Sequence, residues 1–260
     1  MTTPVYGQFH RIEQMLGVEA VQQLHASRVI VAGLGAVGGF ALEALARSGV
    51  GSFCLIDCDT IKPSNINRQI LALWPTVDLP KTEVARQRIL AINPNAQIDI
   101  HNVLLNASTI GPLLDSQPHT DFLVDAIDSL GPKVELIAST LQRNIPIISS
   151  MGAALRTDPS AIRVGPLTEV THCPLSAMVR KRLRRRGVST DDVPCVYSPE
   201  PVRELHGQHI LPPECSEDDR SLPGRRRSTL GSLPTITGIF GLILAHEVIR
   251  RLAAGKENKS

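Results

Sequence analysis

The sequence is poor in aromatic residues and has no paired cysteines. Aromatic side chains make up 3% of the 260 residues, so any core must be aliphatic. The five cysteines are odd in number and include no CxxC pair: Cys54, Cys58, Cys173, Cys195 and Cys215. This pattern argues against a disulfide scaffold and against a four-cysteine zinc site, so we expect no zinc. The N-terminal segment lacks an apolar block, so we expect no secretory signal and a reducing, cytoplasmic compartment.

Long apolar runs are missing as well. A helix is predicted over residues 236–252, but Gly238 and Gly241 interrupt its apolar stretch. The stretch reaches His246 and Glu247 after about ten residues, whereas a membrane-spanning helix needs about 20 apolar residues. We therefore predict a buried core helix or a subunit-interface helix, with membrane contact as the less favoured alternative.

No charge sign dominates the whole chain, but the two parts of the sequence differ. The hydrophobic share of 42% is typical of a packed protein and excludes a wholly disordered chain. Residues 1–150 carry 10 basic and 13 acidic side chains, and residues 151–260 carry 17 basic and 12 acidic ones. Six cations occupy the seven positions 180–186. The mixed, weak charge of the first part is typical of a domain that binds a small molecule, whereas the clustered positive charge of the second part favours a polyanionic partner.

Short apolar runs alternate with helical patterns along the first part of the chain. We predict strands at 28–32, 52–56, 97–101, 121–125 and 145–149, and helices at 12–26, around 41–46, at 81–92 and at 132–143. This alternation predicts an α/β fold with a doubly wound, mostly parallel Rossmann-like sheet. We divide the chain into a nucleotide-binding domain at 1–150 and a basic C-terminal region at 151–260. The latter would hold an amphipathic helix at 174–186, long loops at 187–231 and the C-terminal helix.

A glycine motif follows the first predicted strand. Gly33, Gly35 and Gly38 form a GxGxxG loop between this strand and a helix, and Asp57 ends the second strand. Such a loop lets phosphates approach the backbone at a helix N-terminus, and the carboxylate can bind ribose hydroxyls. Alone, these residues suit NAD, FAD, S-adenosylmethionine or ATP equally well. The plainer alternative, that the glycines serve only close helix–strand packing, does not account for Asp57.

Further polar residues favour a nucleoside triphosphate. Asn65, Arg68 and Gln69 lie within about one helical turn of each other, and Lys81 opens the next predicted helix. A triphosphate needs cations that also stabilise a leaving pyrophosphate. Asp128 follows a strand end, where a carboxylate can hold Mg²⁺. Taken singly, Arg68 and Lys81 could be surface ion-pair partners and Asp128 a helix cap.

These residues together resemble the ubiquitin-activating-like adenylyltransferase superfamily (HesA/MoeB/ThiF). The similar pattern runs over residues 9–150 and comprises the glycine loop, Asp57-x-Asp59, Asn65-x-x-Arg68-Gln69, Lys81 and Asp128. Within that superfamily the chain looks most like the tRNA threonylcarbamoyladenosine dehydratases. The segments that carry this closer likeness include residues 9–13, 43–51, 149–154 and 157–159. The segment at 171–174 departs from the pattern because it lacks an expected Asp after His172, and residues 195–231 match poorly.

The resemblance implies an enzyme that uses ATP and Mg²⁺ on tRNA. It would adenylate the threonine carboxylate of the modified adenosine, and the carbamoyl group would then close a ring and expel AMP. Asp57, Asp59, Gln69 and the three glycines would bind ATP. Asn65, Arg68, Lys81 and Asp128 would act in catalysis, with Asp128 as the Mg²⁺ ligand and Arg11 acting in the partner's site of a homodimer. tRNA would bind six cations of the basic helix: Arg180, Lys181, Arg182, Arg184, Arg185 and Arg186.

Such a reaction needs no enzyme thiol, and we expect Cys54 and Cys58 to belong to the core.

Three other functions remain open. The first is an adenylyltransferase that activates a ubiquitin-like sulfur-carrier protein, although its relatives usually carry paired CxxC motifs. The second is an NAD-dependent oxidoreductase, which gives no reason for Arg68 and Lys81. The third is a non-catalytic tRNA- or partner-binding protein. A sulfur-relay partner is compatible with the leading interpretation.

Overall fold

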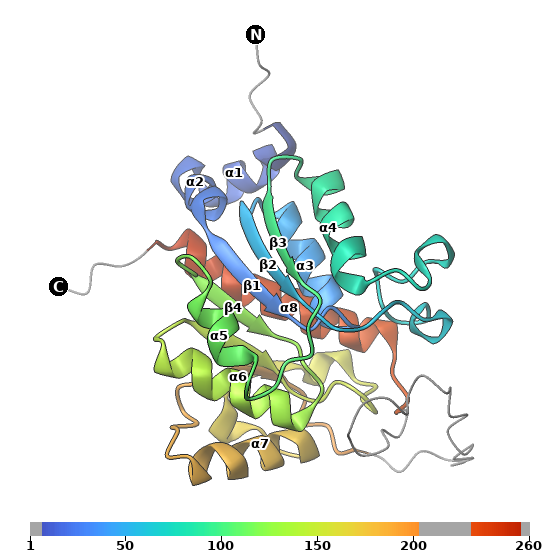
Figure 1. Ribbon diagram of the computed structural model, residues 1–260, viewed down its shortest axis with the longest axis vertical. Helices are drawn as coiled ribbons and strands as arrows, with labels where there is room; N and C mark the ends of the chain where they lie inside the picture. The colour runs from blue at the N-terminus through green and yellow to red at the C-terminus, as the bar shows by residue number, and fades with distance from the viewer. Residues whose placement is uncertain (1–6, 203–229, 256–260) are drawn as a thin grey trace, which may run out of the picture.

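A seven-stranded sheet forms the centre of the computed structural model, which describes residues 7–202 and 230–255 (Figure 1). The strand order is β3-β2-β1-β4-β5-β7-β6, and all neighbours are parallel except the β6–β7 pair. The strands are β1 (Arg28–Ala32), β2 (Ser52–Ile56), β3 (Gln97–His101), β4 (Phe122–Asp125), β5 (Ile147–Ser150), β6 (Arg163–Pro166) and β7 (Pro194–Tyr197). The first five lie within two residues of their predicted positions, so the predicted fold class is confirmed.

Helices cover both faces of the sheet, and β1 shows why. Val29 and Val31 point into one aliphatic core, whereas Ile30 and Ala32 point into the other. A strand buried on both faces is typical of parallel sheets in doubly wound folds. The first core is shared with α2 (Val18–Ala26), α3 (Gly38–Arg47), α4 (Lys81–Ile92) and α8 (Pro234–Ala253). The second is shared with α5 (Ile110–Asp115), α6 (Leu130–Gln142) and α7 (Pro174–Arg185).

The N-terminal helix differs from its prediction. Residues 12–26 do not form one helix, because α1 (His10–Leu16) ends at Gly17 and α2 begins at Val18. Gly17 has a φ of 89°, a conformation that glycine adopts with little strain. α2 then leads directly into β1, which puts this helical pair beside the edge where the strands begin (Figure 1).

The C-terminal region contributes to the same sheet. Residues 187–231, predicted as long loops, contain β7, which pairs parallel with β5 and antiparallel with β6. This strand was not predicted, because its four residues are too few to show alternation and they lie next to Pro-rich sequence. The division of the chain at residue 150 stays a prediction. Residues 203–229, with Cys215, lie outside the described part of the chain.

The two glycines of α8 allow it to lie close to α3. A Cβ on Gly241 would be 2.3 Å from the Val37 carbonyl oxygen and 2.8 Å from Phe40 Cβ. Ile236, Phe240 and Leu244 of α8 are fully buried in the first core. α8 is therefore a core helix, as one of the two favoured alternatives predicted. Within the described ranges, no helix is both long and apolar enough to cross a membrane.

Candidate nucleotide-binding site

The glycine turn lies at the carboxyl end of β1, where the strand order reverses between β1 and β4. Open α/β sheets bind ligands in the crevice at this point. Gly33 has a φ of +88°, and a Cβ on Gly38 would be 1.8 Å from the Gly33 carbonyl oxygen. Neither position therefore accepts a larger side chain. A Cβ on Gly35 would meet only Gln69 Nε2 at 3.9 Å, so the middle glycine leaves the approach to the backbone open.

Asp57 fixes this turn from the neighbouring strand. Its Oδ2 accepts a hydrogen bond from the Leu34 backbone N–H at 2.7 Å, and its Oδ1 accepts one from Asp59 N–H at 2.8 Å. Burial raises the pKa of the Asp57 carboxyl, although the Lys81 charge and the two backbone donors act in the opposite direction. Asp57 thus shapes the turn besides lying where a ribose would bind, a role that sequence spacing does not reveal.

Lys81 and Asp59 form an ion pair next to this turn. The Lys81 ammonium lies 2.8 Å from Asp59 Oδ2 and 4.0 Å from Asp57 Oδ1. The Lys81 side chain is 6% exposed, and its backbone N–H donates to the Asp59 carbonyl at 3.0 Å. The sequence placed these three residues in one site, and the structure brings them together. A cation held in this way is positioned to meet phosphate oxygens.

The segment with Asn65, Arg68 and Gln69 forms a compact turn, as predicted from their spacing. The N–H groups of Arg68 and Gln69 donate to the Asn65 carbonyl at 3.1 and 2.9 Å. Gln69 is buried toward Gly35, and its Oε1 is a buried atom with no hydrogen-bond partner. Arg68 is half-buried, and its Nη1 donates to the Ser64 carbonyl and to Asn67 Oδ1, both at 2.9 Å. The turn therefore places the Gln69 side-chain amide beside the glycine turn, with its Nε2 toward Gly35.

Asp128 lies on the loop between β4 and α6, across from the glycine turn. This loop meets the turn at Ala126, whose carbonyl oxygen would be 2.8 Å from a Cβ on Gly33. The Asp128 side chain is exposed, and Ser129 Oγ donates to its Oδ1 at 3.2 Å. One carboxylate together with substrate phosphates is a common way to bind Mg²⁺, so the donor at Asp128 fits this ion.

A second group of possible metal ligands is less suitable for a cation. Ligand atoms of Asp57, Cys58 and Asp59 lie within 4.8 Å of one another. The Lys81 ammonium already pairs with Asp59 and lies near Asp57, so its positive charge would repel a metal ion. Cys54 is buried as expected, but Cys58 is exposed and is not a core residue; it follows the strand end by two positions, where the chain has left the sheet.

Arg11 lies apart from the glycine turn of its own chain. It is an exposed residue of α1, and Figure 1 shows α1 beside the ends at which β1 and β2 begin. The glycine turn follows the opposite end of β1. Arg11 is therefore not part of the site built by its own chain.

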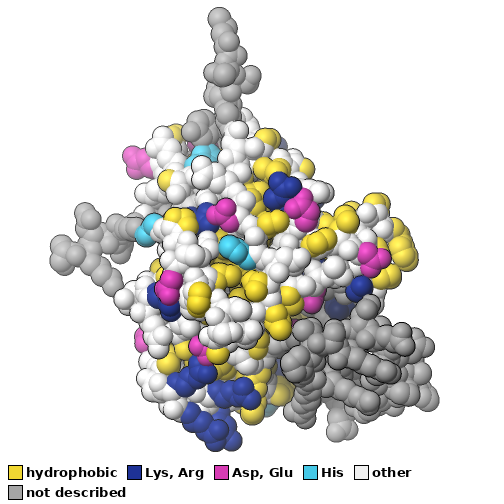
Figure 2. Space-filling view, in the orientation of Figure 1, with side chains coloured by type: hydrophobic (Ala, Val, Ile, Leu, Met, Phe, Trp, Pro, Cys, Tyr) yellow, Lys and Arg dark blue, Asp and Glu magenta, His cyan; other side chains and the backbone are white. Residues whose placement is uncertain are grey.

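The predicted basic helix exists as α7, and its cations differ in their surroundings. Arg180 Nη1 donates to the carbonyls of Leu167 and Val170, at 3.0 and 2.6 Å, so this guanidinium is tied into the fold. Arg186 pairs with Glu135 at 2.6 Å. The other four are exposed and form no ion pair with any described residue: Lys181, Arg182, Arg184 and Arg185. Dark-blue side chains gather in this region of the surface, at the bottom of Figure 2.

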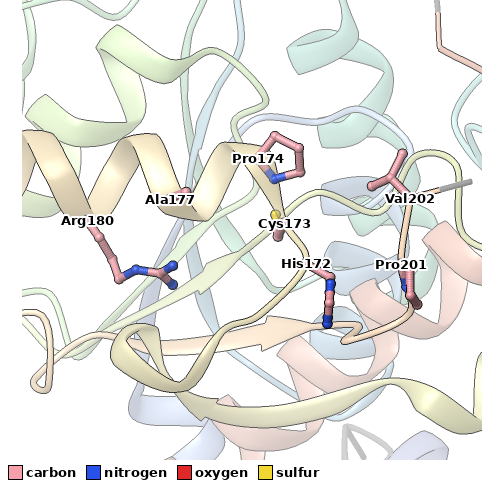
Figure 3. A pocket seen from close by; sticks show the side chains of 7 residues that line it. All are labelled: His172, Cys173, Pro174, Ala177, Arg180, Pro201 and Val202. Carbon is pink, nitrogen blue, oxygen red and sulfur yellow. The ribbon is translucent and has the colours of Figure 1, made fainter.

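A hollow of about 390 Å³ lies at the start of α7 (Figure 3). His172, Cys173 and Pro174 line one side, and Pro201 and Val202 line another. A Cβ on Gly152, just beyond β5, would be 3.4 Å from Cys173 Sγ. The hollow therefore lies on the carboxyl side of the sheet, the side that also carries the glycine turn.

Several buried polar residues on this side were not predicted from the sequence. Asp125, Lys133 and Ser149 form a hydrogen-bonded cluster below the Asp128 loop. Glu200 accepts hydrogen bonds from Thr157 N–H, Thr157 Oγ1 and Asp158 N–H. The only sequence signal for the first cluster was an Asp at the end of an otherwise apolar strand, followed eight residues later by a Lys.

The fold and the site define a nucleotide-binding α/β protein, and comparison with known proteins supplies the family. The chain matches the model of the ThiF family over residues 9–260. It therefore belongs to the ThiF family, which confirms the resemblance drawn from its motifs.

Relatives of known activity cover nearly the whole chain. The tRNA threonylcarbamoyladenosine dehydratase of Bacillus subtilis (strain 168) is 38% identical over 97% of this chain and 97% of its own length. The molybdopterin-synthase adenylyltransferase of Escherichia coli (strain K12) is 36% identical over 89% of this chain and 75% of its own. The crystal structure of E. coli tRNA N6-threonylcarbamoyladenosine dehydratase in complex with ATP matches with a TM-score of 0.85 at 29% identity, covering 100% of both chains.

Proposed function

We propose that this protein is an ATP-dependent tRNA threonylcarbamoyladenosine dehydratase. The threonine carboxylate of the modified adenosine attacks the α-phosphate of ATP and displaces pyrophosphate. The carbamoyl group of the same side chain then attacks the acyl carbon of the adenylate and expels AMP. A ring closes, and the oxygen lost from the nucleoside leaves in AMP, so that the nucleoside loses one water. This is adenylation chemistry of the ligase type.

The observation that carries the proposal is the full-length match to a dehydratase with ATP bound. The glycine turn and the Lys81–Asp59 pair agree with it, because a triphosphate needs an open backbone cradle and a nearby cation. We assign ATP binding to Gly33, Gly35 and Gly38, with Asp57, Asp59 and Gln69.

The catalytic roles belong to residues around this cradle. Lys81 and Arg68 would neutralise charge on the phosphates and the leaving pyrophosphate, and Asn65 would hold a phosphate or a metal-bound water. Asp128 would hold Mg²⁺, which supplies charge neutralisation at the phosphates. Since the nucleophile belongs to the substrate, the protein acts mainly by positioning and by electrostatic stabilisation.

The exposed cations of α7 favour tRNA over a sulfur-carrier protein as substrate. Lys181, Arg182, Arg184 and Arg185 have no ion-pair partner in the described ranges, so they offer their full charge to phosphates. The paired CxxC motifs of sulfur-carrier activating relatives are absent from the sequence. The hollow at the start of α7 is a candidate space for the nucleotide to be modified.

We also infer a homodimer in which Arg11 reaches the partner's site. This assignment agrees with the position of α1, which lies away from the glycine turn of its own chain. A tRNA substrate is compatible with the cytoplasmic location expected from the sequence, and a sulfur-relay partner stays compatible with this activity. Size-exclusion chromatography with light scattering tests the dimer. In mixtures, an inactive Lys81 variant should restore activity to an inactive Arg11 variant, because mixed dimers contain one intact site.

The activity is tested by incubating the protein with ATP, Mg²⁺ and tRNA that carries threonylcarbamoyladenosine. Mass spectrometry of the released nucleoside should show the loss of one water, with one AMP formed for each nucleoside. If pyrophosphate exchange appears only with a small diglycine-tailed protein, the chain is a sulfur-carrier adenylyltransferase instead. Tight binding of NADH, or no turnover with any of these substrates, also contradicts the proposal.

The tRNA surface has a separate test in the triple variant Arg182→Ala, Arg184→Ala and Arg185→Ala. Its affinity for tRNA should fall. The slope of log affinity against log salt concentration should also become less steep, by the amount expected for the loss of about two to three phosphate contacts. Arg186→Ala is the matched control, because Glu135 already neutralises Arg186. Equal losses in the triple and control variants contradict a role for this face of α7.

A further inference from the structure

The cluster of Asp125, Lys133 and Ser149 lies in the interior of the protein, below the Asp128 loop. All three side chains are fully buried. The Lys133 ammonium is 2.6 Å from Asp125 Oδ2 and donates to Ser149 Oγ at 3.1 Å, and Ser149 Oγ donates to the same carboxylate oxygen at 2.6 Å. Asp125 ends β4, Ser149 lies beside it on β5, and Lys133 comes from α6.

Such a pair is a poor source of net stability. Removing two charges from water costs several kcal/mol for each ion, and the attraction between them offsets that cost only in part. Apolar residues of similar volume often stabilise a core equally well. A buried ion pair does have demanding geometry, because each polar atom must keep its partner. The cluster is therefore better suited to fixing one arrangement of the chain than to raising overall stability.

The arrangement that it fixes is the loop with Asp128. Asp125 and Lys133 stand at the two ends of residues 125–133, so the ion pair links the start of this segment to its end. Within the segment, Asp125 Oδ1 accepts from Ile127 N–H at 3.1 Å, and Lys133 N–H donates to the Ser129 carbonyl at 3.1 Å. Asp128 lies between these two anchored positions.

The same loop is also attached to the glycine turn. Ala126 N–H donates to the Ala32 carbonyl at 2.8 Å, directly before Gly33. The Ala126 carbonyl is the group that a Cβ on Gly33 would meet at 2.8 Å. The start of the loop is thus tied to the turn by its backbone, which fixes the point from which the Asp125–Lys133 pair places the Asp128 carboxylate.

We propose that Lys133, Asp125 and Ser149 are positioning residues for nucleotide binding, which hold the Asp128 carboxylate at the distance from the glycine turn that Mg·ATP requires. They act through the loop and do not touch the nucleotide. The inference rests on the proposed function for the identity of the ligand. Its prediction concerns Mg·ATP binding, which needs no tRNA.

The test is a double-mutant cycle between Lys133→Met and Asp128→Asn, read as the Kd of Mg·ATP by calorimetry. Lys133→Met should weaken binding by about 10- to 100-fold in the wild-type background, because a misplacement of about 1 Å has effects of that size. In the Asp128→Asn background, Lys133→Met should weaken binding less than about threefold, because the residue through which Lys133 acts is already lost. Equal factors in both backgrounds overturn the proposal.

Arg28→Met is the matched control. Arg28 is also a nearly buried cation, but it lies at the start of β1 and binds Ser52, Asp99 and Gln117. Its effect on Mg·ATP binding should be small and equal in both Asp128 backgrounds. An Arg28 effect that also disappears in Asp128→Asn would mean that general destabilisation causes the coupling, and would overturn the proposal.

Hydrogen exchange gives a readout without nucleotide. The amides of residues 126–131 and 133 should exchange faster in Lys133→Met than in wild type, whereas those of β1 and β2 should not change. If Lys133→Met does not fold, the neutral double variant Asp125→Asn with Lys133→Gln avoids an unpaired buried charge, and Ser149→Ala keeps the ion pair. Unchanged exchange in the loop of whichever variants fold overturns the proposal.

The outcomes also separate this inference from the proposed function. A wild-type protein that binds Mg·ATP and shows the coupling but leaves modified tRNA unchanged would overturn the proposed function alone. Normal dehydration with no coupling would overturn the inference alone. A wild-type protein that does not bind Mg·ATP contradicts both.

Discussion

Two buried cations, Arg28 and Lys133, lie near opposite ends of the parallel strands of one sheet. They bind similar partners but have different roles. Each binds a carboxylate and a serine hydroxyl, Asp99 and Ser52 for Arg28, and Asp125 and Ser149 for Lys133. At the edge where strands begin, Arg28 joins β1, β2 and β3, and its partner Asp99 is 60% exposed. At the carboxyl edge all members are fully buried and close one loop. The first cluster connects strands, whereas the second arranges a binding site.

The largest expected effect distinguishes the two edges by activity. Lys81→Met at the carboxyl edge should lower kcat/KM for dehydration by about 1,000-fold, because it removes a cation that stabilises the leaving pyrophosphate. Arg28→Met should lower the free energy of unfolding by about 1–2 kcal/mol, since its carboxylate partner is partly solvated. Steady-state kinetics and urea denaturation of both variants check this. A large catalytic loss in Arg28→Met would break the comparison.

Two glycines near the carboxyl ends of the strands, Gly38 and Gly131, allow a second comparison on this side of the sheet. Gly38→Ala should weaken ATP binding by about 100-fold, because its Cβ would be 1.8 Å from the Gly33 carbonyl oxygen and the turn must move. Gly131→Ala in α6 is the control, since nothing lies within 4 Å of its Cβ. The control should stabilise the protein by about 0.5–1 kcal/mol. Calorimetry with ATP and thermal denaturation measure the two effects.

These experiments concern features that the sequence revealed to different degrees. The order of strands and helices up to β5 was predictable except for the six-residue helix α5, because each apolar run is short and each of the other helices is marked by glycine, proline or a charged first turn. Gly33, Gly38, Asp57 and Lys81 were predictable as one site, because parallel strands end at a common edge. The contacts of Lys133 and Arg180 were not, since a cation looks the same in sequence whether it meets solvent, a carbonyl or a buried carboxylate.

β7 and the break at Gly17 were missed for local reasons. A four-residue strand has too few positions to show alternation, and its place in the sheet depends on β5 and β6. The helical spacing of apolar residues continues across Gly17, so periodicity alone gave one helix. In both places tertiary packing decides the structure.

Asp57 should make stability depend on pH at the carboxyl edge. Burial raises its pKa in the folded protein above the unfolded value. Between these two values the folded state binds more protons than the unfolded state, so the free energy of unfolding falls as pH rises through this window. Asp57→Asn lacks this contribution, so the stability of the variant relative to wild type should increase with pH across that window. Urea denaturation from pH 4 to about 7 tests the sign, and a difference that decreases with pH contradicts it.

The smallest expected effect concerns Cys58, which is exposed beside the site. Partial burial of its sulfur and the charges of Asp59 and Asp57 raise the pKa of the Cys58 thiol to about 11. Alkylation by iodoacetamide at pH about 8 should therefore be slower than for an ordinary exposed thiol. Asp59→Asn should accelerate it by a few-fold, as mass spectrometry of the labelled peptide would show. Rapid labelling of the wild type contradicts this electrostatic interpretation.

The contact between Gly241 and Val37 has a consequence for how the chain folds while it is being synthesised. α8 follows all seven strands of the sheet in the sequence, yet it covers the helix that follows the glycine turn. Until Ile236, Phe240 and Leu244 emerge, the face of α3 that they will bury stays in contact with water. The nucleotide-binding half of the nascent chain therefore cannot complete its packing until α8 has been made. In that interval the uncovered apolar face of α3 favours aggregation of the partly made chain.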